Sequence, residues 1–385
     1  MKRLTFRFSW RQLAPSLVCL ALILILLWIP TGYEDAVIYQ ESAHCAALVL
    51  DTDESTLIDT GLIRSGEQLC TLRLLGTSFE GQITTGVNLL TGSLTQDKLF
   101  EPGDRALVLV NASGGQIRSV SMIDHYRLPG ELWLAGLFAL LLLVFAGSTG
   151  LRALLSFVMT VLMIWKVLVP AFLNGVNPVW AGLAMTVTLC VMVVLLVFGF
   201  DRRAGAAIAG CTLGVAVTCV MGVVFTDLFR IHGAVMENAE SLLYNGYAHL
   251  NLTQIFMAGI FIGASGAVMD LAVDIASAVG EVVQKSPDIS RWAAVRSGMT
   301  VGRAALATQT TTLLLAYSGG YMALLMSFMA QGTPIYAIFN LKYVAAEILH
   351  TLVGSFGLCA VAPLTALTSG LLLTGRGNSQ KARSI

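Results

Sequence analysis

The stretch Gly259 to Arg303, with the sequence GIFIGASGAVMDLAVDIASAVGEVVQKSPDISRWAAVRSGMTVGR, decides how this chain folds. It begins as an apolar helix of the kind that crosses a membrane, yet it carries Asp270, Asp274 and Glu281. At about 100° per residue the three carboxylates fall within roughly 40° of one another on a helical wheel. A charge in the hydrocarbon layer costs on the order of 3 kcal/mol on insertion scales. We therefore expect this face of the helix to meet protein or water.

Small residues extend the same stripe toward the start of the helix. Glycines four residues apart let two membrane helices approach closely, so the glycines of this kind are predicted to pack helices together. Gly259 and Gly263 on the stripe and Gly210 and Gly214 on an earlier span are such pairs, and Gly266 on the stripe and Gly354 on the last span are predicted to pack as well. The acidic stripe is therefore expected to face another helix rather than lipid.

The composition is that of a multispanning membrane protein. The 385 residues are 56% hydrophobic and only 12% charged, and the mean hydropathy of +0.77 is far from that of a soluble domain. The formal net charge is zero and the basic residues form no long run, so nothing suggests nucleic-acid binding. The lipid bilayer is the first partner that the sequence implies.

Eight apolar segments are long enough, or nearly so, to cross a hydrocarbon layer of about 30 Å at about 1.5 Å per residue. The first follows a basic N-terminus and ends at Pro30. We interpret it as an uncleaved anchor, because no small-x-small cleavage site follows it. The spans are expected at about 13–29, 131–149, 151–171, 178–199, 204–226, 252–280, 304–329 and 343–373.

The basic residues alternate between the connections as the positive-inside rule requires. The predicted cytoplasmic pieces hold Arg152, Arg202, Arg203, Lys285, Arg291, Arg296, Arg376, Lys381 and Arg383, and the opposite short loops hold only Arg230 and Lys342. We therefore expect a bacterial plasma-membrane protein with both termini in the cytoplasm. Its predicted parts are a tail and anchor at 1–30, an extracytoplasmic β domain at 31–128, a seven-helix membrane domain at 129–375 and a cytoplasmic tail at 376–385.

The β domain is predicted because short strand-like runs alternate with turn sequences. Runs such as CAALVL, QLCTLRLL and RALVLV are separated by DTDES, LGTSFEG and EPGD. Cys45 and Cys70 lie in this domain. Outside the cytoplasm they could form a disulfide, but two buried free thiols fit the sequence equally well.

Polar residues on the span that follows the acidic stripe could meet it. Arg303 begins this span, and Thr310 follows seven residues later. One interpretation pairs Arg303 with Glu281 or Asp274. In the other, Arg303 only extends to the membrane surface and the threonines bond to their own helix.

Glu347 and His350 on the last span share one side of a helix, because they are three residues apart. Together with Asp270 and Asp274 they supply oxygen and imidazole ligands that could hold a divalent cation. The alternative is that His350 only donates a packing hydrogen bond. The sequence requires no cofactor. It also lacks HExxH, GxSxG, a P-loop lysine and a GxGxxG in a suitable context, so we expect no enzyme.

Several short motifs of the membrane domain occur together in one protein family. They are GAVMD at 266–270 with Asp274, Ile275 and Glu281; Ser297-Gly298 and Gly302-Arg303; Thr312-Leu313 and Leu315-Ala316-Tyr317; and Glu347 with Gly354-Ser355-Phe356-Gly357 and Pro363-Leu364-Thr365. With these motifs the chain resembles the YibE/F-like family of bacterial multispanning membrane proteins across about 130 to 370. The anchor followed by a β domain is similar to the longer members.

One segment departs from the family pattern. Where the family has Gly-Thr-Met-x-Asn-Thr, this chain has ATQTTT at 307–312, so Thr311 takes the place of the asparagine. The resemblance implies a multispanning membrane fold, and from that architecture it implies transport.

Functions of different classes fit the sequence. The first is a secondary transporter or exporter of a small solute or ion, in which Asp270 and Asp274 bind a proton or cation and Glu347 and His350 contribute across a helix interface. The second is a membrane scaffold or assembly factor whose external β domain recruits a protein partner. An intramembrane hydrolase is a weaker third, and the chain could form a homo-oligomer.

Overall fold

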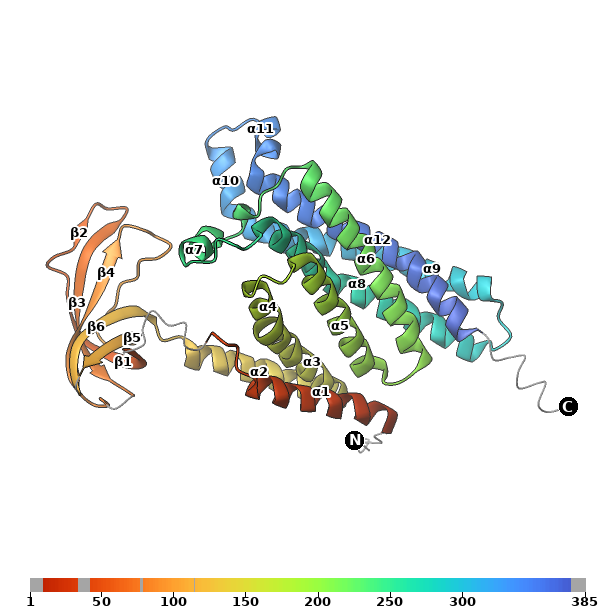
Figure 1. Cartoon of the computed structure of the whole chain (residues 1–385), viewed down its shortest axis with the longest axis horizontal. Helices are drawn as coiled ribbons and strands as arrows, with labels where there is room; N and C mark the ends of the chain where they lie inside the picture. The colour runs from red at the N-terminus through yellow and green to blue at the C-terminus, as the bar shows by residue number, and fades with distance from the viewer. Residues whose placement is uncertain (1–9, 34–41, 77–78, 114, 375–385) are drawn as a thin grey trace. The chain divides into compact units, whose positions relative to one another are not determined.

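The computed structural model describes residues 10–33, 42–76, 79–113 and 115–374, so the predicted tail 376–385 and the basic residues before Trp10 lie outside the described part. The chain divides into two compact units, Met1–Thr31 with Ala146–Ile385 and Gly32–Phe145. The first unit is helical, and the second contains the strands and one long helix (Figure 1).

The helices account for most of the described chain. They are α1 (Trp10–Trp28), α2 (Leu128–Ala146), α3 (Ser148–Met163), α4 (Val169–Leu173), α5 (Pro178–Phe198), α6 (Arg202–Leu228), α7 (Ala239–Tyr244), α8 (Leu252–Lys285), α9 (Arg291–Ser318), α10 (Met322–Ala330), α11 (Ile335–Asn340) and α12 (Lys342–Leu373). Three short helical turns, η1 (Ile164–Leu168, a π-helix), η2 (Gly233–Val235) and η3 (Gly319–Tyr321), lie between them.

Seven helices of the described chain are long and apolar enough to cross a membrane, where α3 to α4 and α9 to α10 each count as one. α1 contributes a shorter apolar segment, Ala14–Trp28. The polytopic helical membrane protein expected from the sequence is therefore confirmed, while the count of eight spans stays a prediction.

Local capping sets the ends of the spans. Asn177 precedes α5, and its side chain accepts hydrogen bonds from the N–H groups of Val179 and Trp180. Gly199 ends α5 with a φ of 71°, a conformation that favours glycine. Ser290 caps α9 by accepting from the Ala293 N–H at 3.2 Å.

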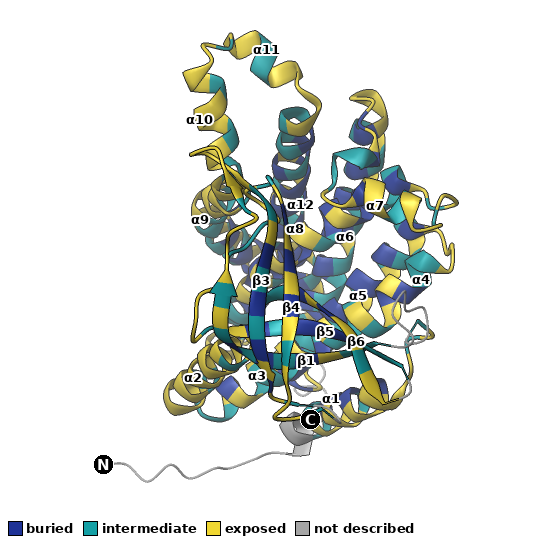
Figure 2. Cartoon of the chain, turned by 90° about the vertical axis from the view of Figure 1, so that its left-hand side faces the viewer, coloured by how far each residue is buried: buried dark blue, intermediate teal, exposed yellow. Residues whose placement is uncertain are grey.

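α8 is the central helix of the bundle, since it contacts α5, α6, α9 and α12. Its buried residues include Val268, Leu271, Ala272 and Ile275, each fully enclosed. Figure 2 shows the buried residues concentrated on α8, α12 and the helices beside them, whereas α10 and α11 are largely exposed.

Glycines bring α6 and α12 together. A Cβ atom at Gly210 would lie 2.7 Å from the Thr365 Cα atom, and one at Gly214 would lie 2.8 Å from the Val361 Cβ atom. Both distances are too short for a side chain, so the predicted packing role of the Gly210-x-x-x-Gly214 motif is confirmed.

The second unit contains a closed β-barrel. Its strands are β1 (Ser42–Asp53), β2 (Ile58–Asp59), β3 (Arg64–Leu74), β4 (Ile83–Thr91), β5 (Arg105–Ser113) and β6 (Gln116–His125). The sheet order is β1-β5-β6-β4-β3-β2, and an antiparallel pairing of β1 with β3 closes it. β4 pairs with β6 in parallel. Five long strands in this Greek-key order make a barrel of the OB type, and the small β domain expected from the sequence is confirmed.

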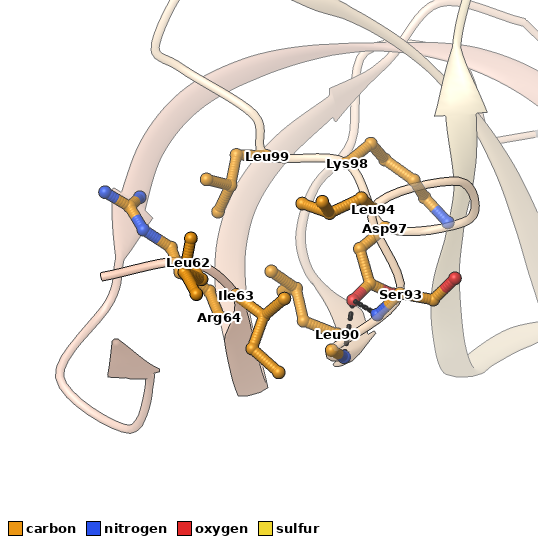
Figure 3. A pocket seen from close by; sticks show the side chains of 10 residues that line it. Leu62, Ile63, Arg64, Leu90, Ser93, Leu94, Asp97, Lys98 and Leu99 are labelled. Atoms are coloured by element: carbon orange, nitrogen blue, oxygen red, sulfur yellow. Dashed lines mark hydrogen bonds between the residues drawn. The ribbon is translucent and has the colours of Figure 1, made fainter. Parts of the chain in front are cut away.

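A surface pocket of about 250 Å³ opens between the β2–β3 turn and the loop after β4 (Figure 3). Leu62, Leu94 and Leu99 provide apolar walls. Asp97 holds the shape of the loop, because its carboxylate accepts hydrogen bonds from the N–H groups at positions 91–93 over 2.6–3.0 Å. These N–H donors, Thr91 foremost, lower the pKa of Asp97.

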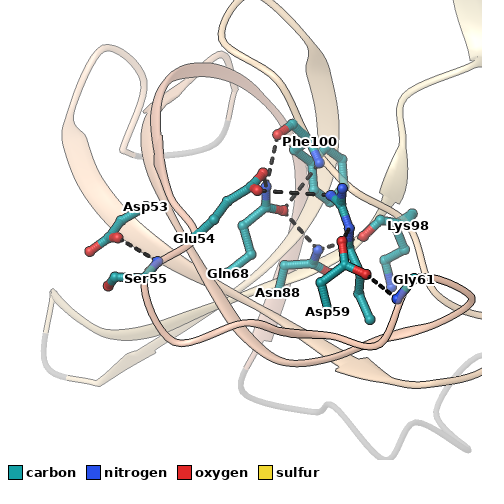
Figure 4. A network of polar contacts seen from close by, with 10 residues as sticks. Asp53, Glu54, Ser55, Asp59, Gly61, Gln68, Asn88, Lys98 and Phe100 are labelled. Atoms are coloured by element: carbon teal, nitrogen blue, oxygen red, sulfur yellow. Dashed lines mark hydrogen bonds and ion pairs between the residues drawn. The ribbon is translucent and has the colours of Figure 1, made fainter.

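Two fully buried amide side chains fasten the later part of the same β4–β5 loop inside the barrel (Figure 4). Gln68 on β3 donates to the Phe100 carbonyl oxygen at 2.9 Å and accepts from the Phe100 N–H at 3.1 Å. Asn88, opposite Gln68 in the ladder, donates to Gln68 Oε1 at 3.0 Å and to the Lys98 carbonyl oxygen at 2.7 Å. The loop thereby pairs its main-chain groups while the Phe100 side chain fills the core.

Cys45 and Cys70 are free thiols buried in the barrel core. Cys70 lies opposite Thr52 on β1, seven residues from Cys45. Seven residues of strand span about 23 Å, which is far beyond the reach of a disulfide. The possible disulfide is therefore wrong, and the alternative of two buried thiols is correct. Burial, with a smaller contribution from the Glu54 carboxylate, raises the pKa of Cys70 to about 11.

Candidate functional site

The acidic stripe of α8 lies on the open side of the helix. Asp270, Asp274 and Glu281 are all exposed in the described chain. At the level of the acids, the expectation that this face packs against another helix is wrong for the described chain, because α8 buries mainly its opposite face, centred on Val268 and Ile275, against its four neighbours.

Arg303 does not neutralise these acids. It is exposed at a point within α9, and among the described residues no ion pair joins it to Asp274 or Glu281. A different arginine reaches the cytoplasmic end predicted for α8: Arg203 of α6 donates to the Gln284 side chain at 3.3 Å. The pairing predicted for Arg303 is therefore absent from the described structure, and extension of its side chain to the surface fits its position better.

The glycines of the stripe fall into two classes. A Cβ atom at Gly263 would lie 2.8 Å from the Tyr317 hydroxyl oxygen, and one at Gly354 would lie 2.9 Å from Leu313. Gly263 and Gly354 thus allow close helix contact as predicted. Among the described residues nothing lies within 4 Å of a Cβ atom at Gly259 or Gly266, so a side chain would fit at either position.

Most threonines of α9 satisfy their own hydroxyl groups. Thr308 donates to the Ala305 carbonyl oxygen at 3.0 Å, and Thr311 and Thr312 donate in the same way one turn back along the helix. This is the back-bonding alternative, and it removes these hydroxyls from the candidate site. Thr310 points about 100° away from Thr311 on the helix and is half-buried.

His350 is the centre of a contact between α8, α9 and α12. Its ring lies 4.7 Å from the Tyr317 ring and 6.3 Å from the Phe256 ring, measured between centroids. A Cβ atom at Gly263 would lie 3.2 Å from His350 Nε2. A side chain at this level of α8 would therefore crowd the imidazole.

Three polar atoms along the α9–α12 seam are buried without a hydrogen-bond partner. They are Gln309 Oε1 on α9, and Glu347 Oε1 and His350 Nε2 on α12. The His350 ring also approaches the Gly259 main chain of α8, which is the packing contact expected in the alternative interpretation. The Tyr321 hydroxyl approaches the Glu347 carboxylate as a donor, and Oε1 of that carboxylate has no hydrogen-bond partner. Buried polar atoms in proteins are nearly always paired, so three unpaired atoms on one seam indicate a place that water, an ion or a ligand completes.

A family comparison gives the context of this seam. The sequence profile of the YibE/F-like proteins matches residues 134–375, which is more than half of the chain. The chain belongs to the YibE/F-like family. No curated protein and no solved structure matches the chain. The barrel of this YibE/F-like protein lies outside the matched region, which contains all candidate residues of α8, α9 and α12.

The proposed metal ligands are not assembled in this YibE/F-like protein. Among the described residues no group of three or more His, Cys, Asp and Glu side chains is placed to hold a metal ion. Asp270 is seven residues from Gly263, which contacts His350, so the carboxylate is about 10 Å further along α8. The set of Asp270, Asp274, Glu347 and His350 therefore divides into an open acidic face and a buried seam.

Proposed function

We propose that this YibE/F-like protein is a secondary transporter of the bacterial plasma membrane, and that the α9–α12 seam is its coupling and binding site. The observation that supports the proposal is the row of unpaired polar atoms on Gln309, Glu347 and His350. Ionisable groups inside the membrane are costly and typically mark ion or substrate pathways.

In this proposal Glu347 and His350 exchange a proton or bind a cation, and the exposed Asp270 and Asp274 lead solute toward the predicted cytoplasmic side. Glu347 and His350 on α12 and the two aspartates on α8 act one after the other rather than as one metal centre, because the aspartates lie about 10 Å further along α8 than the level of His350. Protonation changes which helix arrangement is favoured, as alternating access requires.

Charge movement tests the proposal. Purified protein in proteoliposomes is exposed to concentration jumps of protons, Na⁺, K⁺, Mg²⁺ and alkylamines on a solid-supported membrane. We expect a transient current for at least one of them, and we expect Glu347→Gln and His350→Ala to abolish it. Asp270→Asn with Asp274→Asn should reduce it. Thr311→Ala is the matched control, since this exposed hydroxyl bonds only to its own helix.

A current that survives in the Glu347 and His350 variants would exclude the seam as the coupling site. Absence of any current from folded wild-type protein would exclude transport of the tested ions and amines.

A second candidate is a scaffold that recruits a protein partner through the barrel, and the barrel's pocket of about 250 Å³ favours it. Deleting residues 35–125 separates the two functions. The scaffold predicts that this deletion removes the cellular function while the Asp270 and Asp274 variants keep it. The transporter predicts the reverse.

A further inference from the structure

A second cavity, of about 330 Å³, lies where the end of α9 meets η3, α10, α11 and the first turns of α12. Leu324 of α10, Phe339 of α11 and Leu352 of α12 supply apolar walls from three separate elements. This volume falls near the lower limit of ligand pockets, about 300 to 1,000 Å³, and suits one chain of a lipid-like molecule better than two.

Glu347 places a carboxylate in the wall of this cavity. Among the described residues that line it, Glu347 is the single acidic one. No ion pair joins Glu347 to a cation within the described structure, and the nearest lysine along α12, Lys342, lies over the Tyr343 ring instead. The carboxylate retains one oxygen with no partner. A carboxylate in apolar surroundings is stabilised by a donor that carries positive charge.

Ser318 and Tyr321, two other polar residues of the wall, do not meet this need. The Ser318 hydroxyl donates to the Leu315 carbonyl oxygen of its own helix, at 3.5 Å. The Tyr321 hydroxyl approaches the carboxylate, but the second oxygen stays unpaired. The aromatic rings of Tyr321 and Phe339 also favour a cation nearby.

We propose that this cavity binds a single-chain amphiphile whose primary amine donates to Glu347 while its alkyl chain lies against Leu324, Phe339 and Leu352. The amine is an ammonium ion that supplies both the hydrogen bonds and the charge that the carboxylate lacks. The inference rests on the proposed function in one respect, since it names the substrate class of the same seam. The amine has two sources, a free alkylamine or an aminolipid of the membrane.

Equilibrium dialysis of the full-length protein in an amine-free detergent tests the site, with dodecylamine as the probe and dodecanol as its uncharged counterpart. We expect saturable dodecylamine binding, at least ten-fold tighter than that of dodecanol. Glu347→Gln should weaken dodecylamine at least ten-fold and leave dodecanol unchanged. Leu324→Trp should remove both by filling the cavity, and Thr311→Ala, outside the cavity lining, should change neither.

Two results would overturn the proposal: dodecylamine binding that is unchanged in Glu347→Gln, or binding that is unchanged in Leu324→Trp. Gel filtration and circular dichroism establish that each variant is folded, and the cavity-filling variant provides the test if the Glu347 variant does not fold.

Native mass spectrometry of protein taken from membranes that contain phosphatidylethanolamine identifies the source of the amine. Retention of this lipid by wild type but not by Glu347→Gln supports the aminolipid, and saturable dodecylamine binding without retained lipid supports a free amine. Absence of both overturns the site. Amine binding without any transient current would refute transport and leave the site standing, whereas a proton current without amine binding would do the opposite.

Discussion

The contact between α6 and α12 provides the sharpest test of how the bundle is held together. Gly210 faces Thr365 so closely that an added Cβ atom would lie 2.7 Å from the Thr365 Cα atom and would also overlap the side chain. Because main-chain atoms cannot turn aside as a side chain can, the helices must separate. We predict that Gly210→Ala destabilises the protein relative to Gly205→Ala, a change on the same helix with nothing within 4 Å of the new atom.

The two substitutions share the same gain in helix propensity and differ in the cost of overpacking. Replacing glycine by alanine inside a helix gains about 1 kcal/mol from helix propensity in both variants. Gly210→Ala also carries the cost of overpacking, about 1 to 3 kcal/mol. The difference between the variants therefore isolates the overlap with Thr365. It corresponds to a lower unfolding midpoint, by about 2 to 10 °C, for Gly210→Ala.

Thermal unfolding in detergent, followed with a fluorogenic maleimide, measures this difference, because Cys190, Cys211 and Cys219 are buried in the same bundle. Each buried thiol reacts only when the helices separate. A Gly210→Ala protein that unfolds at or above the midpoint of Gly205→Ala would refute the close α6–α12 contact.

Further predictions concern the barrel. Gln68→Ala leaves the Phe100 N–H and carbonyl groups buried without a partner, at about 1 to 3 kcal/mol each, so hydrogen exchange of this loop should accelerate. The pKa of Asp97 is held below its usual 3.8 by N–H donors. The stabilisation from the ionised Asp97 carboxylate is therefore present above pH 3.8 and lost as the pH falls below it. Between about pH 5 and pH 2 the folding stability of wild type should fall more steeply with decreasing pH than that of Asp97→Asn. Cys45 and Cys70 should resist maleimide at neutral pH in the folded barrel, and a disulfide between them under oxidation would contradict the strand register.

The spans could be predicted because their signals are local. The sequence predicts a span at 178–199, and α5 runs from Pro178 to Phe198, between a capping asparagine and a glycine with positive φ. The π-helix between α3 and α4 was not foreseen, and neither was the break of the span 304–329 into α9, η3 and α10. Apolar length determines whether a segment crosses the membrane, but small changes of helix geometry within it depend on its neighbours.

The buried face of α8 could not be predicted from its pattern. The helix carries alanine, valine and isoleucine nearly all round, so the side opposite the acids is as able to pack as any other. The neighbours α5, α6, α9 and α12 pack mainly on the face opposite the acids, and on the stripe itself Gly263 lies close to Tyr317 and His350. Which face is buried depends on long-range contacts, and a single sequence does not state them.

The place of Gln309 in the seam could be predicted from its spacing to the glycines of α9. Thr310 was the expected site residue, and adjacent positions on a helix point about 100° apart. Gly298 and Gly302 mark the face of α9 that packs against α12, because Cβ atoms there would contact Ala366 and Ala362 at 3.1 Å. Steps of four, seven and four residues from Gly298 reach Gly302, Gln309 and then Leu313, which is buried against Gly354. A glutamine on a stripe of small and apolar residues within a membrane span faces protein rather than lipid, so its carbonyl oxygen requires a partner that the neighbouring helices do not supply.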